Sequence, residues 1–114
     1  MFKWVEGRKD SGYSKLKLLE SKFLKFDMYI LKFPTGSYVE PHHDKVEGHE
    51  HHRLNVILNK KFTGGMFCIR REIRNFYLFQ EHNRIIKFRP DEQLHAVSQV
   101  LSGTRYVLSI GWLK

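Results

Sequence analysis

The stretch VEPHHDKVEGHEHH, residues 39–52, holds five of the chain's seven histidines within fourteen residues. Three explanations fit it: a zinc site, a solvated loop rich in histidine, or half of a catalytic metal centre whose other half lies further along the chain. Side chains two residues apart on a β-strand share a face, with their Cα atoms roughly 6.6 Å apart. A strand at residues 37–44 would therefore place His42 beside Asp44 and point His43 the other way.

The composition predicts one globular domain, residues 1–114. Hydrophobic residues make up 41% of the chain and aromatic residues 14%, which argues against disorder. No apolar run approaches the ~18 residues of a membrane helix, and the N-terminus lacks the apolar centre of a signal peptide. Cys68 is the only cysteine, which excludes an internal disulfide and indicates a cytoplasmic location. The net charge of +8 favours anionic partners.

Short runs rich in β-branched and aromatic residues predict a mainly all-β fold. Turn signals such as Pro34-Thr35-Gly36 and Ser102-Gly103 separate these runs, and many short strands at this spacing indicate a sandwich or a jelly roll. We expect strands at residues 27–33, 37–44, 52–58, 65–70, 75–79, 83–88, 94–100 and 104–112.

The first 26 residues admit two interpretations. Apolar residues recur near helical spacing between Leu16 and Phe26, whereas KLKLL at 15–19 alternates as a strand does. We therefore expect a short N-terminal segment that is either a helix or an extended arm.

A third metal ligand is needed beside His42 and Asp44, and His95 in EQLHAV is the other well-placed strand histidine. Two neutral imidazoles and one carboxylate on one side of a metal leave the opposite positions open, which suits non-haem Fe(II) and O₂ chemistry. Arg105 follows ten residues after His95, and a strand-borne arginine is well shaped to bind a carboxylate through two parallel hydrogen bonds. The alternative for His42, Asp44 and His95 is a structural cluster held by hydrogen bonds. The alternative for Arg105 is an ordinary arginine of the surface or the barrel.

The order of these motifs resembles the Fe(II)/2-oxoglutarate-dependent oxygenases, above all their prolyl-4-hydroxylase-like branch. The resemblance covers roughly residues 27–112 and implies a double-stranded β-helix, in which the strand ending in His-x-Asp lies beside the strand of the distal histidine. It also implies Fe(II) held by the three ligands, 2-oxoglutarate as co-substrate with its C5 carboxylate on the arginine, O₂, and ascorbate as a reductant. The motifs are, in order, His42-x-Asp44, Leu58-Asn59, Gly64-Gly65-x-Phe67, Ile85-Ile86-x-Phe88, His95 and Arg105.

Further co-substrate contacts are expected from two strands. Arg53 and Asn55 share one face, and Arg-x-Asn here resembles the Arg-x-His that contacts 2-oxoglutarate in aspartyl/asparaginyl β-hydroxylases, with asparagine in place of histidine. The alternative is a pair of polar residues on an edge strand. We expect the opposite face (Leu54, Val56 and Leu58) to be core. Tyr29 is either a core residue or a phenol that reaches the 2-oxoglutarate carboxylate.

Three function classes follow. The resemblance implies a dioxygenase that hydroxylates a C–H bond of a protein side chain or another substrate, with release of succinate and CO₂. A cupin-like metalloenzyme that does not use 2-oxoglutarate is disfavoured by Arg105. A non-catalytic basic jelly roll that binds nucleic acid or protein has no need of all three ligands.

Basic residues crowd the N-terminal segment and the stretch after the Gly-Gly turn. If these segments flank the metal, they favour an anionic substrate such as an acidic peptide, a nucleic acid or a phosphorylated metabolite; otherwise their charge only aids solubility. The residues are Lys3, Arg8, Lys9, Lys15, Lys17, Lys22, Lys25, Arg70, Arg71, Arg74 and Arg84. We expect four histidines to be exposed to solvent, namely His49, His51, His52 and His82.

Overall fold

The computed structural model describes residues 3–7, 11–44, 48–70, 77–80, 85–92 and 94–114, and these ranges contain twelve strands. The strands are β1 (Trp4–Glu6), β2 (Ser14–Ser21), β3 (Phe26–Phe33), β4 (Val39–His42), β5 (His51–Ile57), β6 (Phe62–Gly64), β7 (Phe67–Arg70), β8 (Tyr77–Gln80), β9 (Ile85–Phe88), β10 (His95–Val97), β11 (Val100–Gly103) and β12 (Arg105–Leu113).

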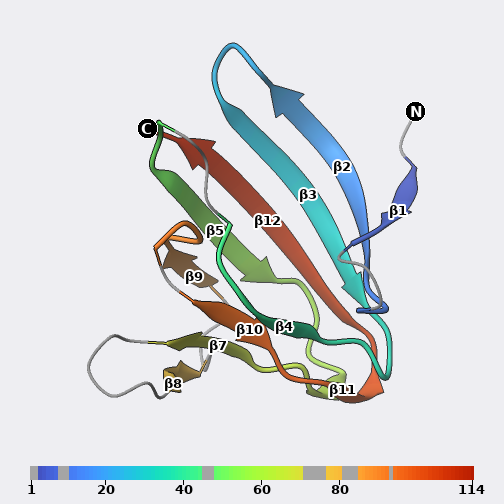
Figure 1. The fold of residues 1–114 in the computed structure, drawn as a ribbon. Coiled ribbons are helices and arrows are strands. Elements are labelled where there is room, and N and C mark those ends of the chain that lie inside the picture. The colour runs from blue at the N-terminus through green and yellow to red at the C-terminus, as the bar shows by residue number, and fades with distance from the viewer. Residues whose placement is uncertain (1–2, 8–10, 45–47, 71–76, 81–84, 93) are drawn as a thin grey trace.

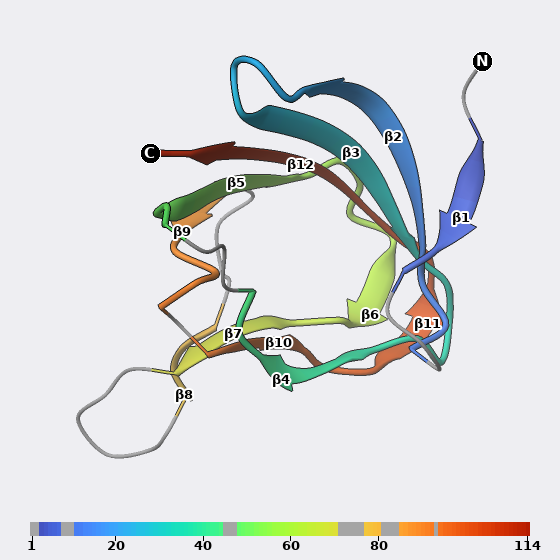
Figure 2. The same ribbon diagram turned by 45° about the horizontal axis from the view of Figure 1, so that its top comes forward.

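The strands form a jelly roll, which confirms the predicted all-β fold. A six-stranded sheet has the order β1-β2-β3-β12-β5-β9, a four-stranded sheet has the order β4-β10-β7-β8, and β11 pairs with β6. Figures 1 and 2 show the two larger sheets facing each other, with β6 and β11 beside them. Among the described residues, no helix is long and apolar enough to cross a membrane.

Period-two alternation along β12 shows which face of the large sheet points inward. Every second residue from Arg105 to Gly111 is buried, and the residues between them are half-buried. The inward residues pair with the inward face of β3, where Val107 lies opposite Leu31 and Ser109 opposite Tyr29. A hydrophobic core lies between the sheets and consists of Phe33, Val39, Phe67, Ile86, Phe88, Val97, Val100 and Val107.

The N-terminal segment is extended, so the helical alternative for it is wrong. β2 pairs with β3 over most of its length and β1 pairs with β2. The backbone of β2 finds hydrogen-bond partners on both sides in the sheet, which outweighs the helical spacing of its leucines. Phe26 begins β3, and Phe23 lies at the turn before it with 91% of its surface exposed.

Two sequences that read as turns are strands that pair with each other. Gly64 lies opposite Val100, and Gly103 opposite Phe62. Both glycines have φ near +75°, and a Cβ on either would collide with the backbone carbonyl of the residue just before the facing strand, Gln99 for Gly64 and Lys61 for Gly103. This close approach requires glycine.

Candidate metal centre

The predicted ligands come together where β4 and β10 pair. His42 is the last residue of β4, His95 is the first residue of β10, and the two lie opposite each other in register. Asp44 follows two residues after the end of β4. His43 is exposed. The strand is shorter than predicted, but the alternation of side chains holds as far as Asp44.

The three side chains are close enough to share one metal ion. The Nε2 atoms of His42 and His95 each lie 3.4 Å from Oδ2 of Asp44, and the two ring centroids are 4.2 Å apart. Two donor atoms that each lie about 2.1 Å from a metal are separated by about 3.0 Å at a right angle and about 3.4 Å at the tetrahedral angle. Among the His, Cys, Asp and Glu residues that the structure describes, these three form a group whose possible ligand atoms all lie within 4.8 Å of one another.

A hydrogen bond at Nδ1 of His42 fixes the ring so that the lone pair of Nε2 points toward the other two candidate ligands. Its Nδ1 lies 2.7 Å from the carbonyl oxygen of Glu40, and since a carbonyl can only accept, Nδ1 carries the proton. In the neutral ring Nε2 is then an acceptor that faces the carboxylate of Asp44. Burial raises the pKa of Asp44, but the imidazole rings of His42 and His95 beside its carboxylate outweigh this and hold the pKa well below its usual range. Nε2 of His42 and the carboxylate of Asp44 are therefore two acceptors that face each other. A cation between them would stabilise this arrangement.

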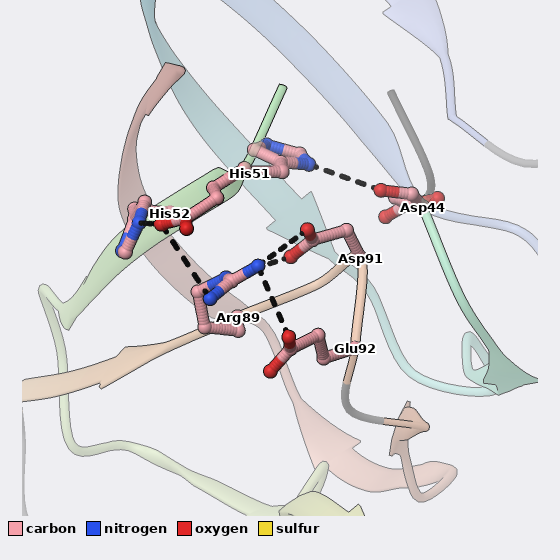
Figure 3. Close-up of polar contacts among 7 residues, drawn as sticks. Asp44, His51, His52, Arg89, Asp91 and Glu92 are labelled. Atoms are coloured by element: carbon pink, nitrogen blue, oxygen red, sulfur yellow. Dashed lines mark hydrogen bonds and ion pairs between the residues drawn. The ribbon is translucent and has the colours of Figure 1, made fainter. Parts of the chain in front are cut away.

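Backbone contacts hold Asp44 in place beyond the end of its strand. Its N–H donates to the carbonyl of Pro90 at 2.8 Å. Nδ1 of His51 lies 3.2 Å from the Asp44 carbonyl and donates to it (Figure 3). Burial lowers the pKa of His51, which keeps its ring neutral near pH 7. Asp44 is thereby tied both to β5 and to the turn that follows β9.

An ion-pair network supports that turn. Arg89 binds Asp91 through two hydrogen bonds of 2.9 and 2.7 Å, and it also approaches Glu92 (Figure 3). Its Nη1 lies 3.7 Å from Glu50. The hydrogen bonds from Arg89 lower the pKa of Asp91 to about 2. Glu50 contacts His52 at 3.1 Å, which connects the turn to the start of β5.

Of the histidines that were expected in an exposed loop after Asp44, His49 lies in that loop, whereas His51 and His52 belong to a strand. His49 contacts Lys25 at 2.9 Å, His52 stacks on Trp112, and all three are half-buried. His51 and His52 are the first two residues of β5. His82 lies outside the described residues.

A cavity of about 350 Å³ opens between the sheets, and the three candidate ligands line it. Arg105 also lines it and is only 2% exposed. The guanidinium carbon lies 5.2 Å from the centroid of the Phe33 ring. Gly65 leaves room for Arg105, because a Cβ there would lie 3.0 Å from its Cδ.

The remaining predicted residues, Arg53, Asn55 and Tyr29, line the same cavity. β5 lies between β12 and β9, so it is not an edge strand. Arg53 donates to Ser109 at 2.7 Å and to Asp27 at 2.6 Å, and Asn55 is 7% exposed.

The outer face of β5 and the phenol of Tyr29 differ in how far they are buried. The expected core on the opposite face of β5 is wrong: Leu54 and Val56 are half-buried, and Leu58 is 44% exposed. Burial raises the pKa of Tyr29, so its phenol stays protonated.

The lining residues that were not predicted include Lys15, Asp27, His51 and Ser109. Ser109 could have been found from the alternation that places it on the face of Arg105. The position of Lys15 depends on β2 joining the sheet, and the sequence leaves that open.

Comparisons with known proteins place the fold. No model of a known protein family matches the chain, and no curated protein does. An oxidoreductase of the 2OG-Fe(II) oxygenase family from Burkholderia pseudomallei superposes with a TM-score of 0.63 at 20% identity over 77% of this chain, which spans only 41% of that protein. A prolyl-4-hydroxylase from Pseudomonas putida gives a TM-score of 0.74 at 13% identity, over 97% of this chain and 76% of the other.

A cupin-2 domain from Rhodospirillum rubrum is similar to a comparable degree. Its TM-score is 0.62 at 12% identity, over 97% of this chain and 69% of the other. Sequence identities this low establish a shared fold and nothing more. The chain thus has a jelly-roll fold that is found both in 2OG-Fe(II) oxygenases and in cupins.

Proposed function

We propose that this protein is an Fe(II)- and 2-oxoglutarate-dependent dioxygenase that hydroxylates a C–H bond of its substrate. One observation carries the proposal: a two-histidine, one-carboxylate donor set and a buried arginine line the same cavity. Such a donor set suits Fe(II) with open positions for O₂ chemistry. A buried guanidinium suits a carboxylate, which it can hold through two charge-assisted hydrogen bonds.

Each residue has a role that follows from its position. His42, Asp44 and His95 would hold Fe(II), which together with 2-oxoglutarate supplies the oxidative chemistry. Arg105 would bind the far carboxylate of the co-substrate, and packing against Phe33 limits its rotation. The rings of Phe67 and Phe88 lie 6.2 and 5.1 Å from that of His95 and shield it from water.

The metal site is tested by adding Fe(II) and 2-oxoglutarate to metal-free protein without oxygen. A weak visible absorption band should appear when iron binds the keto acid. His42→Ala, Asp44→Ala and His95→Ala should each lose the band while the protein stays folded by circular dichroism. His43→Ala is the matched control and should keep it, because that side chain is exposed. A band that needs His43 but not His42 would contradict the site.

A cupin-like metalloprotein that does not use 2-oxoglutarate is the second candidate, because cupins are among the structural neighbours. Succinate release separates the two. With Fe(II), ascorbate and O₂, the proposed oxygenase should slowly convert 2-oxoglutarate to succinate even without substrate, and Arg105→Ala should prevent this. Metal binding with no succinate release would favour the cupin-like candidate.

A further inference from the structure

We propose that Lys15 is a substrate-recognition residue, and that the cavity accepts a substrate whose carboxylate pairs with it. This inference rests on the proposed function and adds the chemical class of the substrate.

Lys15 points into the cavity from β2. It pairs in register with Leu31, whose side chain also lines the cavity, and its Nζ lies 5.3 Å from the centroid of the Tyr29 ring. Among the residues that the structure describes, no carboxylate forms an ion pair with Lys15. Lys17, two residues further along β2, binds Glu20 at 3.0 Å and does not line the cavity. Lys15 is therefore the lysine available to a bound anion.

Lys15 and Arg105 occupy different positions on the inner wall. Leu31, the partner of Lys15, lies opposite Val107 on β12, and Val107 is two residues from Arg105. Two strand spacings of ~4.8 Å and two residues of ~3.3 Å place the Cα atoms of Lys15 and Arg105 about 12 Å apart. The stacked rings of Tyr13 and Phe33 also line the cavity. The two cations can thus bind two separate anionic groups.

The charges in the cavity leave one positive charge for the substrate. Lys15, Arg53 and Arg105 line it together with two carboxylates, those of Asp27 and Asp44. Arg53 and Asp27 neutralise each other in an ion pair of 2.6 Å. The two positive charges of a divalent metal would exceed the single negative charge of Asp44 by one. The two negative charges of the co-substrate would balance this remaining positive charge and that of Arg105. Lys15 then remains without an opposite charge, which a single carboxylate supplies.

The size of the cavity limits what carries that carboxylate. Its volume of about 350 Å³ is near the lower end of small-molecule sites, which span roughly 300–1,000 Å³. Beside the co-substrate it has room for a small acid or for one acidic side chain.

The test compares binding of acids with binding of their uncharged amides. The probes are a capped aspartate against a capped asparagine, and butyrate against butyramide, titrated calorimetrically into protein loaded with Mn(II) and 2-oxoglutarate. Without O₂ no turnover occurs, so the readout is affinity alone. At least one acid should bind about tenfold more tightly than its amide, equivalent to about 1.4 kcal/mol. Which acid shows the preference separates a free acid from an acidic side chain.

Lys15→Met should abolish that preference, whereas the matched control Lys17→Met should retain it. Equal affinity for acid and amide in the wild type, or equal losses in the two variants, would overturn the proposal. Failure of the proposed function looks different: the wild type would bind the acid in a Lys15-dependent way but would never release succinate from 2-oxoglutarate.

Discussion

Replacing Gly111 with alanine should destabilise the fold through one side chain, that of Arg53. Gly111 lies opposite Arg53 across β12 and β5, and an added Cβ would overlap the guanidinium. The far end of an arginine can usually move aside, but here it is held by hydrogen bonds of 2.7 Å to Ser109 and 2.6 Å to Asp27. Alanine at 111 must therefore break these bonds or shift the strand.

The size of the effect follows from those two bonds. A hydrogen bond to a charged group contributes about 1.5–3 kcal/mol, and the partial exposure of Arg53 and Asp27, 16% and 28%, favours the low end. Removing glycine from a strand returns about 0.5–1 kcal/mol. We expect a net loss of about 2–3 kcal/mol, which lowers Tm by roughly 10 °C for a domain of this size.

Urea unfolding of four proteins measures this: wild type, Gly111→Ala, Arg53→Met and the double variant. Once Arg53 is methionine, Gly111→Ala should cost nothing or stabilise by up to about 1 kcal/mol, so the coupling energy of the cycle should be about 2–4 kcal/mol. If Gly111→Ala costs the same in both backgrounds, the destabilisation does not act through Arg53 and the reasoning is refuted.

Three further predictions concern single residues. Arg105→Ala should weaken 2-oxoglutarate binding strongly, measured by titrating the visible band, and Arg105→Lys should recover part of it, since lysine keeps the charge but not the paired hydrogen bonds. Gly65→Ala should weaken the same binding without removing a charge, because its Cβ presses on Arg105 at a residue with φ of +60°; unchanged affinity would contradict this. Arg89 lowers the pKa of Asp91 from 3.8 to about 2. The Asp91 carboxylate therefore stabilises the fold above pH 4 and loses this effect as the pH falls toward 2, and Asp91→Asn removes it at every pH. The difference in urea stability between wild type and Asp91→Asn should shrink over that range, and a constant difference would speak against the pair.

Much of the fold and of the candidate metal site is readable from the sequence because the signals are local. Alternation over a few residues predicted most of the strands, and the spacing of His42 and Asp44 on one face depends only on the period of a strand. His95 and Arg105 carry their chemistry in their side chains, and their order along the chain suggested their partners. The structure brings these four residues to one cavity.

The tertiary structure alone decided which face of a strand points inward and which segments join a sheet. On β5 the apolar face was expected to be core, yet Arg53 and Asn55 face the cavity, because β3 and β12 present Asp27 and Ser109 to bind the arginine. Lys15 reaches the cavity because β2 hydrogen-bonds to β3, a pairing that local propensity could not choose over a helix. Both outcomes depend on residues distant in the sequence. Buried Arg53 is stable because β3 and β12 supply its opposite charge and its hydrogen bonds, and Lys15 is placed by the backbone pairing of β2 with β3.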